Sequence, residues 1–174
     1  MRVAGAAAFA AAALLGACSS LPRPADRRAG ETFSGRIAIR AESEARSTIA
    51  AFDLSGRPDA GELDLSTPLG AVLGRARWAP GQVELITPQG RKAYPTLDAL
   101  TQEVLGETLP VAALFDWLKG QPWPGAPSAA RGAGAAGFEQ LGWSVDLAEL
   151  DAAVVTAVRR APPAVTVRVK LDRP

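Results

Sequence analysis

The sequence predicts a mainly antiparallel β domain with two helices in the middle of the chain. Apolar and polar side chains alternate from residue 34 to residue 94 and again from residue 143 to residue 171, which is the pattern of strands with one buried face. Between residues 96 and 118 the apolar spacing becomes helical. This order of elements favours an antiparallel sheet with helices packed on one face or across one end, not a doubly wound α/β fold.

Five strands are expected before the helices. The breaks between them are short and contain proline and glycine, as in Thr67-Pro68-Leu69-Gly70. Short turns of this kind join neighbouring strands of an antiparallel meander. The expected strands cover residues 36–40, 50–54, 62–65, 71–78 and 82–86.

Two helices are expected next. The first begins after Thr96, whose hydroxyl can cap it, and stops at Gly106. The second opens at Pro110, which suits a first helical turn, and closes at Gly120, with Trp117 at the flank of its apolar face. The apolar faces carry Leu97, Leu100, Val104 and Leu105 in the first helix and Val111, Leu114, Phe115 and Leu118 in the second.

A loop is expected at residues 121–137, which are rich in proline, glycine and alanine. Residues 132–137 match the dinucleotide-binding pattern G-x-G-x-x-G, but no strand is expected before them and a strand rather than a helix is expected after them. Nucleotide binding is therefore not expected. Three strands complete the sheet at residues 143–147, 154–158 and 165–171.

The first 17 residues are interpreted as a cleaved signal peptide, because Arg2 precedes an apolar run too short to span a bilayer. Residues 15–18 resemble the lipobox of bacterial lipoproteins, which implies diacylglycerol on the Cys18 thiol and an acyl chain on the new amine. The alternative is an ordinary secreted protein with an incidental cysteine, although a lone thiol is unusual in an oxidising compartment. Residues 18–32 are interpreted as a lipidated tether and residues 33–174 as one domain.

Composition argues against several functions. The chain has no histidine, so a Ser-His-Asp or Cys-His arrangement cannot be built and the commonest metal ligand is missing. Loss of Arg2 with the signal peptide reduces the 19 basic residues to 18, equal to the 18 acidic ones, so nucleic acid is not an expected partner. Glu62 and Asp64 alternate with leucines and are interpreted as an outer strand face. No catalytic residue, metal or cofactor is therefore expected.

The informative pattern is apolar. The alternation turns leucine and aromatic side chains to one concave side of the sheet, beneath the helices. Filled cores and ligand-holding half-barrels produce the same pattern, so both remain open. The expected concave residues are Phe52, Leu54, Leu63, Leu65, Trp78, Trp143 and Leu147 from strands and Leu114 and Leu118 from the second helix.

Several segments, in the same order along nearly the whole chain, are together similar to the outer-membrane lipoprotein receptor LolB family. They are the lipobox and residues 33–38 (FSGRIA), 65–70 (LSTPLG), 109–120 (LPVAALFDWLKG) and 137–143 (GFEQLGW).

This resemblance implies an unclosed β-barrel, or half-barrel, capped by helices, with a hydrophobic cavity that binds the acyl chains of other lipoproteins. It implies a receptor on the periplasmic face of the outer membrane that takes lipoprotein cargo from the soluble periplasmic carrier LolA and releases it into the inner leaflet. Ser19 after Cys18 is similar to lipoproteins sorted to that membrane. The family's protruding membrane-insertion loop matches Pro68, Leu69 and Gly70. A monomer is expected.

Two other classes remain open from the residues alone. One is an envelope scaffold or assembly lipoprotein with a filled core and no lipid cargo. The other is a lipid-modifying or cell-wall enzyme, which the missing histidine makes the weaker of the two.

Overall fold

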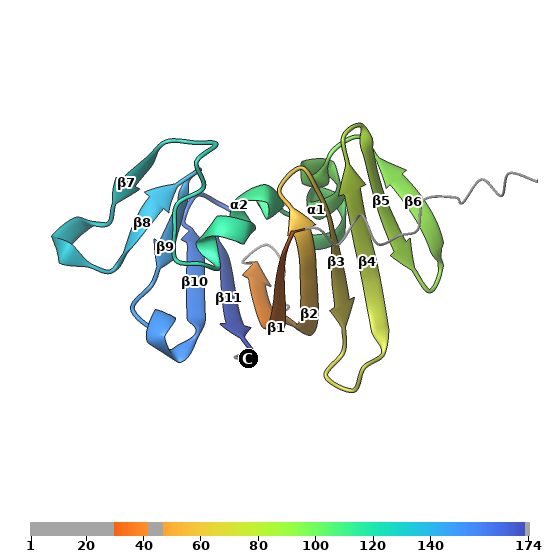
Figure 1. Cartoon of the computed structure of the whole chain (residues 1–174), viewed down its shortest axis with the longest axis horizontal. Coiled ribbons are helices and arrows are strands. Elements are labelled where there is room, and N and C mark those ends of the chain that lie inside the picture. Colours follow the sequence, from red (N-terminus) through yellow and green to blue (C-terminus); the bar gives the residue numbers. More distant parts are fainter. Residues whose placement is uncertain (1–29, 42–46, 173–174) are drawn as a thin grey trace, which may run out of the picture.

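The computed structural model describes residues 30–41 and 47–172, most of which belong to strands (Figure 1). The two helices are α1 (Leu97–Leu105) and α2 (Val111–Trp117), and η2 (Gly132–Gly134) and η3 (Leu150–Ala152) are single 3-10 turns. Before the helices the strands are β1 (Glu31–Ala41), β2 (Ser47–Arg57), β3 (Ala60–Ser66), β4 (Val72–Ala79), β5 (Gln82–Thr87) and β6 (Gly90–Tyr94). After the helices they are β7 (Ser128–Ala130), β8 (Gly137–Gln140), β9 (Trp143–Asp146), β10 (Val154–Arg159) and β11 (Val165–Leu171).

All eleven strands form one antiparallel sheet in the order β6-β5-β4-β3-β2-β1-β11-β10-β9-β8-β7. Neighbours in the sheet are neighbours in sequence, except that β1 pairs with β11 and so joins the two halves of the chain. Strand β1 begins at Glu31, inside the range interpreted as a tether. Because β6 and β7 lie at opposite ends of the order, the curved sheet is unclosed, and the predicted fold class is confirmed.

All eight strands predicted from the alternation are present, and β6, β7 and β8 join them. Four of the five residues of β6 are exposed, so this strand shows no apolar alternation. Strand β7 lies inside the predicted loop, and its three residues are all exposed. The expectation that no strand precedes residues 132–137 is therefore wrong, whereas β8, and not a helix, follows them as predicted.

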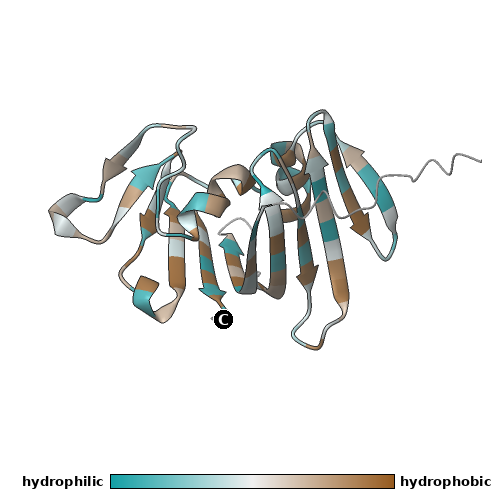
Figure 2. Ribbon diagram, viewed as in Figure 1, coloured by the Kyte–Doolittle hydropathy of each residue, from teal (hydrophilic) through white to brown (hydrophobic). Residues whose placement is uncertain are grey.

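The sheet has a concave face that holds the core and a convex face that carries charge. Along β1, Ile37 and Ile39 are buried, whereas Arg36 and Arg40, which flank them, are exposed. Figure 2 shows the same alternation of hydrophobic and hydrophilic residues along the other long strands. Period-two alternation thus places the apolar side chains against the helices.

Ion pairs cross the convex face from β3 to β6. Arg75 binds both carboxylate oxygens of Asp64, and Arg77 lies 2.5 Å from the carboxylate of Glu62. Glu84 of β5 then pairs with Arg91 of β6 at 3.2 Å. These pairs are cross-strand neighbours, so Glu62 and Asp64 belong to the outer face, where the alternation placed them.

Both helices lie where the sequence places them. The hydroxyl of Thr96 accepts a hydrogen bond from the amide of Ala99 at 3.1 Å, and Gly106 ends α1 in the left-handed conformation with φ of 73°. Two residues differ from expectation: Val104 of α1, predicted on the apolar face, is 46% exposed, and Trp117 of α2, predicted at the flank, is 1% exposed. None of the helices in the described residues is long and apolar enough to cross a membrane.

Candidate functional site

Helix α2 is part of the hydrophobic core. Five of its side chains and C-terminal neighbours pack against the concave face of the sheet, none of them more than 4% exposed. A seven-residue helix buried on this much of its surface belongs to the interior and is not an amphipathic cover. The five residues are Val111, Ala113, Phe115, Trp117 and Leu118.

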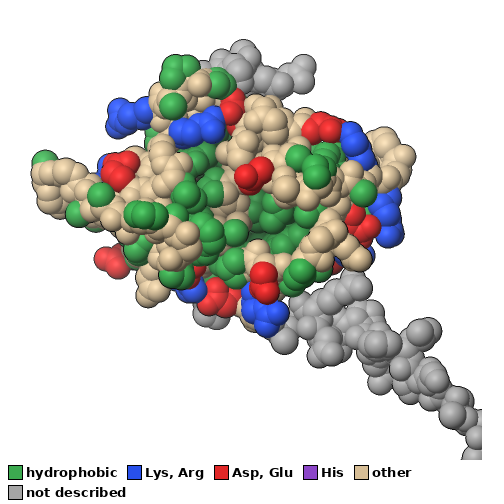
Figure 3. Space-filling view, turned by 90° about the horizontal axis from the view of Figure 1, so that it is seen from above, with side chains coloured by type: hydrophobic (Ala, Val, Ile, Leu, Met, Phe, Trp, Pro, Cys, Tyr) green, Lys and Arg blue, Asp and Glu red, His purple; other side chains and the backbone are tan. Residues whose placement is uncertain are grey.

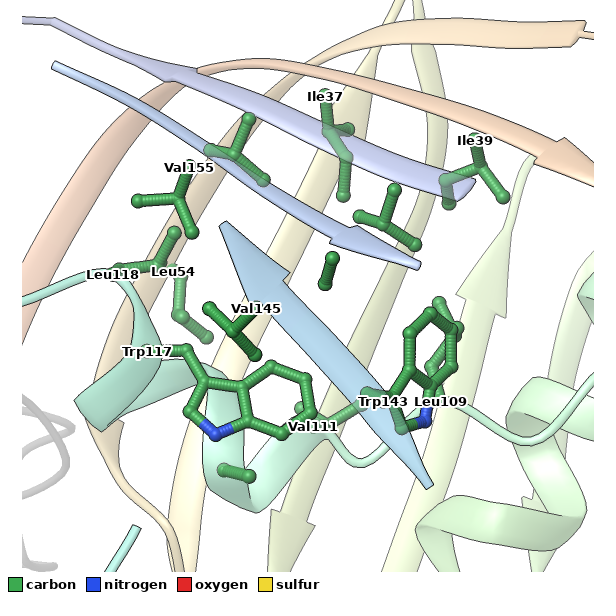
Figure 4. Close-up of a cluster of buried hydrophobic side chains, with 14 of the residues drawn as sticks. Ile37, Ile39, Leu54, Leu109, Val111, Trp117, Leu118, Trp143, Val145 and Val155 are labelled. Carbon is green, nitrogen blue, oxygen red and sulfur yellow. The ribbon is translucent and has the colours of Figure 1, made fainter. Parts of the chain in front are cut away.

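Aromatic contacts fix α2 to both halves of the sheet. The Trp117 ring lies 6.2 Å from that of Trp143 and 6.4 Å from that of Phe138, and Figure 4 shows the two indoles side by side below Val145. Such edge and tilted contacts add to the stability gained from burial alone. On the other side of the helix, Phe115 meets Phe33 and Trp78 edge-on, each at 6.3 Å.

Gln140 is a buried polar hub beside α2. Its amide oxygen accepts hydrogen bonds from the Trp117 indole at 2.8 Å and from the Trp123 backbone amide at 2.9 Å. Its amide nitrogen donates to the backbone oxygens of Trp123 and Ala126. A side chain that is 3% exposed thus uses four hydrogen bonds to hold α2 and the following loop on β8.

The predicted concave residues fall into two groups. The larger group is buried in the core cluster and has little accessible surface, and the smaller group is only partly buried at its margin. Sequence alternation assigns both groups to the same face and does not separate them. The buried residues are Phe52, Leu54, Trp78, Leu118 and Trp143; the partly buried ones are Leu63, Leu65, Leu114 and Leu147.

A partly open apolar surface lies on β3 and β5, next to α1. Leu63 and Leu65 of β3 and Val83 and Leu85 of β5 are neither fully buried nor fully exposed. Leu100 of α1 covers part of this surface in a small cluster separate from the main core. Figure 3, seen from above, shows a hollow lined with hydrophobic side chains and charged groups mostly around its rim.

Helix α1 is attached to the sheet by polar contacts and by a smaller buried surface than α2, with Leu97 and Leu105 only partly buried against the main core. Leu100 and Thr101 are its only buried residues. Glu103 pairs with Lys92 of β6 and accepts a hydrogen bond from the Tyr94 hydroxyl at 3.0 Å. The bonds from Lys92 and Tyr94 lower the pKa of the Glu103 carboxyl, and burial together with the bond to Glu103 raises the pKa of Tyr94.

A buried ion pair ties the connection between the helices to the far half of the sheet. Glu107 is 5% exposed and pairs with Arg159 at the end of β10. The guanidinium also lies over the Trp143 ring, 5.6 Å from its centroid. The Arg159 Nε is buried and has no hydrogen-bond partner among the residues that the structure describes.

The Pro-Leu-Gly turn protrudes between β3 and β4, at the lower edge of Figure 1. The backbone oxygen of Thr67 accepts a hydrogen bond from the Gly70 amide at 2.8 Å, which closes a four-residue turn with Pro68 and Leu69 at its tip. Gly70 has φ of 85°, a conformation that favours glycine. Leu69 is 98% exposed, so this side chain has no packing role in the domain.

Cys18, predicted to carry the lipid, lies outside the described residues. Within residues 30–41 and 47–172, no cluster of three carboxylate, cysteine or histidine side chains could hold a metal ion.

Comparison with known proteins identifies the family. The family model described as "Outer membrane lipoprotein LolB" matches residues 32–172. The chain belongs to the LolB family.

The alignments with known relatives cover most of both chains. The outer-membrane lipoprotein LolB of Bordetella pertussis is 35% identical over 154 residues, which are 83% of this chain and 77% of the relative. That of Bordetella petrii is 36% identical over 160 residues, or 86% and 80% of the two chains. The LolB of Chromobacterium violaceum is 30% identical over 141 residues, or 77% and 76%.

Membership of the LolB family makes this chain an outer-membrane lipoprotein with the family's receptor role in lipoprotein insertion. The family is one of non-enzymatic receptors, in agreement with the prediction that the chain is not an enzyme. Membership also implies interaction with the carrier LolA and with lipoprotein cargo.

Several residues of the site were not predicted. The sequence predicts Trp117 at the flank of its helix. It carries no signal for Gln140 or for the Glu107–Arg159 pair, because partners that meet through long-range folding have no fixed spacing. Val83 and Leu85 could have been found, since they continue the alternation of the predicted fifth strand.

Proposed function

We propose that this protein accepts the acyl chains of lipoproteins from LolA on the concave side of its sheet and releases them into the outer membrane. The observation that carries this proposal is the partly open apolar surface of Leu63, Leu65, Val83 and Leu85 beside α1. Partly exposed apolar side chains are ordinary when single, but a contiguous group of them is typical of a ligand-binding groove.

The physical need for such a surface follows from the cargo. Each buried methylene contributes about 0.8 kcal/mol, so an acyl chain of about 15 methylenes is on the order of 12 kcal/mol less stable in water. Cargo must therefore pass from one apolar surface to another. Transfer runs downhill if this receptor binds cargo more tightly than LolA does and less tightly than the bilayer.

The fully buried residues of the concave face are proposed to support the binding surface and not to contact cargo directly. Phe52, Leu54, Trp78, Leu118 and Trp143 form the floor against which α2 is fixed. Leu63, Leu65 and Leu114, which are partly buried, line the margin that meets the acyl chain first. Movement of α1 away from β5 and β6 enlarges that margin, because Leu100 is its main apolar contact there.

Anchoring rests on the N-terminal segment. We propose that residues 1–17 are removed and that Cys18 receives diacylglycerol and an N-linked acyl chain, which hold the domain on the periplasmic face as a monomer. Two or more acyl chains give stable attachment where one alone is marginal.

Release into the membrane is assigned to the Pro68-Leu69-Gly70 turn. Burying an exposed leucine in lipid gains about 1.5–3 kcal/mol. Replacing Leu69 by Asp is expected to block delivery to vesicles and to leave acceptance of cargo from LolA unchanged. Normal delivery by this variant would exclude the assignment.

A second candidate, the envelope scaffold, is favoured by one observation: most predicted concave residues are already buried against α2. A scaffold of this kind would take no cargo. The two functions therefore differ in a transfer assay.

The test uses the mature chain with Cys18→Ala, mixed with a lipoprotein bound to LolA. We expect the lipoprotein to move to this protein. Leu85→Gln is expected to weaken the transfer, whereas Ile86→Gln, on the convex face of the same strand, serves as the matched control. No transfer to the folded wild-type chain, with active LolA, would favour the scaffold.

A further inference from the structure

Exposed apolar side chains gather at one end of the sheet. Six large hydrophobic residues of the described part are exposed, and four of them are Ile49, Leu69, Val72 and Leu73. Val72 is 60% exposed and Ile49 59%. The other two, Val104 and Leu141, lie singly on α1 and in the β8–β9 turn.

Strand register brings the four residues together. Ser66, the last residue of β3, lies opposite Ala51 of β2 on one side and Val72 of β4 on the other. Ile49 lies on the same face of β2 as Ala51, two residues nearer the end of the sheet where β3 meets the Leu69 turn. The Leu69 turn continues from Ser66 beyond the same end.

We propose that Ile49, Val72 and Leu73 join Leu69 in one lipid-contacting surface, the apolar end, and that the domain stands on the bilayer with this end down. The proposal rests on the proposed function and extends it from one loop residue to the orientation of the whole domain.

The chemistry of the apolar end fits lipid better than a protein partner. All four side chains are aliphatic, whereas the centres of protein interfaces are enriched in tryptophan, tyrosine and arginine. Three of the four, Leu69, Val72 and Leu73, lie on one projecting hairpin between β3 and β4. A fluid hydrocarbon layer accepts a projection of any shape, but a protein needs a matching pocket.

Charge on the convex face sets a limit to the depth of contact. The Arg75–Asp64 pair follows Val72 along the hairpin, about 10 Å of strand away. Charged groups stay at the headgroup level, so insertion of the β3–β4 hairpin stops there. Arg40 of β1, which is exposed opposite Ser47 beyond Ile49, likewise keeps the β2 side of the surface at the headgroups. This depth matches the roughly 5–10 Å by which surface-bound apolar groups enter a bilayer.

The length of chain before β1 permits this orientation. Glu31 lies opposite Gly56, whereas Ala38 lies opposite Ile49, so β1 begins about 23 Å of strand from the apolar end. The 13 residues from Cys18 to Gly30 make 12 Cα–Cα steps and reach at most about 40 Å when extended. A lipid on Cys18 and the apolar end can therefore occupy the same membrane.

The first test measures binding of the mature Cys18→Ala chain to vesicles of phosphatidylethanolamine and phosphatidylglycerol. The variant with Ile49→Thr, Val72→Thr and Leu73→Gln, which keeps Leu69, is expected to bind at least tenfold more weakly. Leu141→Gln, which removes a leucine exposed elsewhere, is the control and is expected to bind as the wild type does. Equal binding by the triple variant and the wild type would overturn the proposal, as would equal loss in the control.

Acceptance of cargo from LolA, measured without vesicles, separates this inference from the proposed function. We expect the triple variant to accept cargo normally. If the wild type accepts none, the proposed function fails, and the vesicle binding still reports on the apolar end by itself.

The second test shortens the chain between lipid and domain in the lipidated protein. Deleting residues 22–28 leaves a reach of at most about 17 Å, which is less than the 23 Å or so required. Delivery of cargo is expected to be lost, and replacement of the same seven residues by glycine and serine is expected to preserve it. Normal delivery by the deletion variant would contradict the proposed orientation.

Discussion

Helices α1 and α2 follow one another in sequence and lie on the same face of the sheet, yet they are held in different ways. Helix α2 is enclosed by aromatic rings and by the Gln140 hub. Helix α1 has two buried residues and depends on contacts such as Glu103 with Lys92. The difference indicates that α2 is a fixed wall and that α1 is the cover over the partly open surface of β3 and β5.

The largest expected effect comes from removing the ring at the centre of α2. Trp117→Ala should lower the free energy of unfolding by about 3–5 kcal/mol, because it leaves a cavity and frees Gln140 from a partner. Leu100→Ala in α1 should lower it by about 2 kcal/mol, since its cluster is small and at the margin. Urea unfolding of both variants checks the comparison, which fails if the α1 change is the more damaging.

Substitution of one glutamine near each helix tests the same difference between α2 and α1. Gln140→Met leaves the Trp117 indole and the backbone groups of Trp123 and Ala126 without partners, which should remove about 3 kcal/mol of stability. Gln102 of α1 also bonds to backbone, donating to the Gly106 oxygen at 2.7 Å, but it is exposed. Gln102→Ala should change stability by less than about 0.5 kcal/mol. Similar losses of stability in the two variants would contradict the conclusion that α2 is fixed in the core and that α1 covers the partly open surface.

The smallest effect is the response of α1 to acid. The pKa of Glu103 is lowered in the folded protein, so its contribution is present at neutral pH and is lost as the pH falls through that lowered value. The protection of α1 amides, measured as their exchange rate relative to the intrinsic rate at each pH, should then decrease in acid, with no matching change in α2. Glu103→Gln should remove this pH dependence. Hydrogen exchange from pH 7 down to about 3 makes the measurement.

Sequence reasoning recovered the parts of this molecule that depend on local rules. The bounds of α1 follow from the Thr96 cap and from Gly106, and the long strands follow from alternation. The exposed turn at Leu69 was also placed correctly between two strands.

What the sequence could not show is depth of burial. Leu54 and Leu63 have the same alternation and lie opposite each other in the sheet, yet one is 1% exposed and the other lies at the open margin. The position of α2 on the sheet determines which of the two leucines is buried. That position depends on the long-range packing of Phe115 and Trp117. Strand β6, with charged residues at its centre, was missed because its pairing and not its composition makes it a strand.

The most direct measurement uses a lipoprotein with a photoactivatable group near the end of one acyl chain. After transfer from LolA to the Cys18→Ala chain, illumination and mass spectrometry locate the attachment. We expect label on β3 and β5, at Leu63, Leu65, Val83 or Leu85, and on the inner side of α1. Label confined to the convex face, or cargo bound without label on these strands, would contradict binding on the concave side.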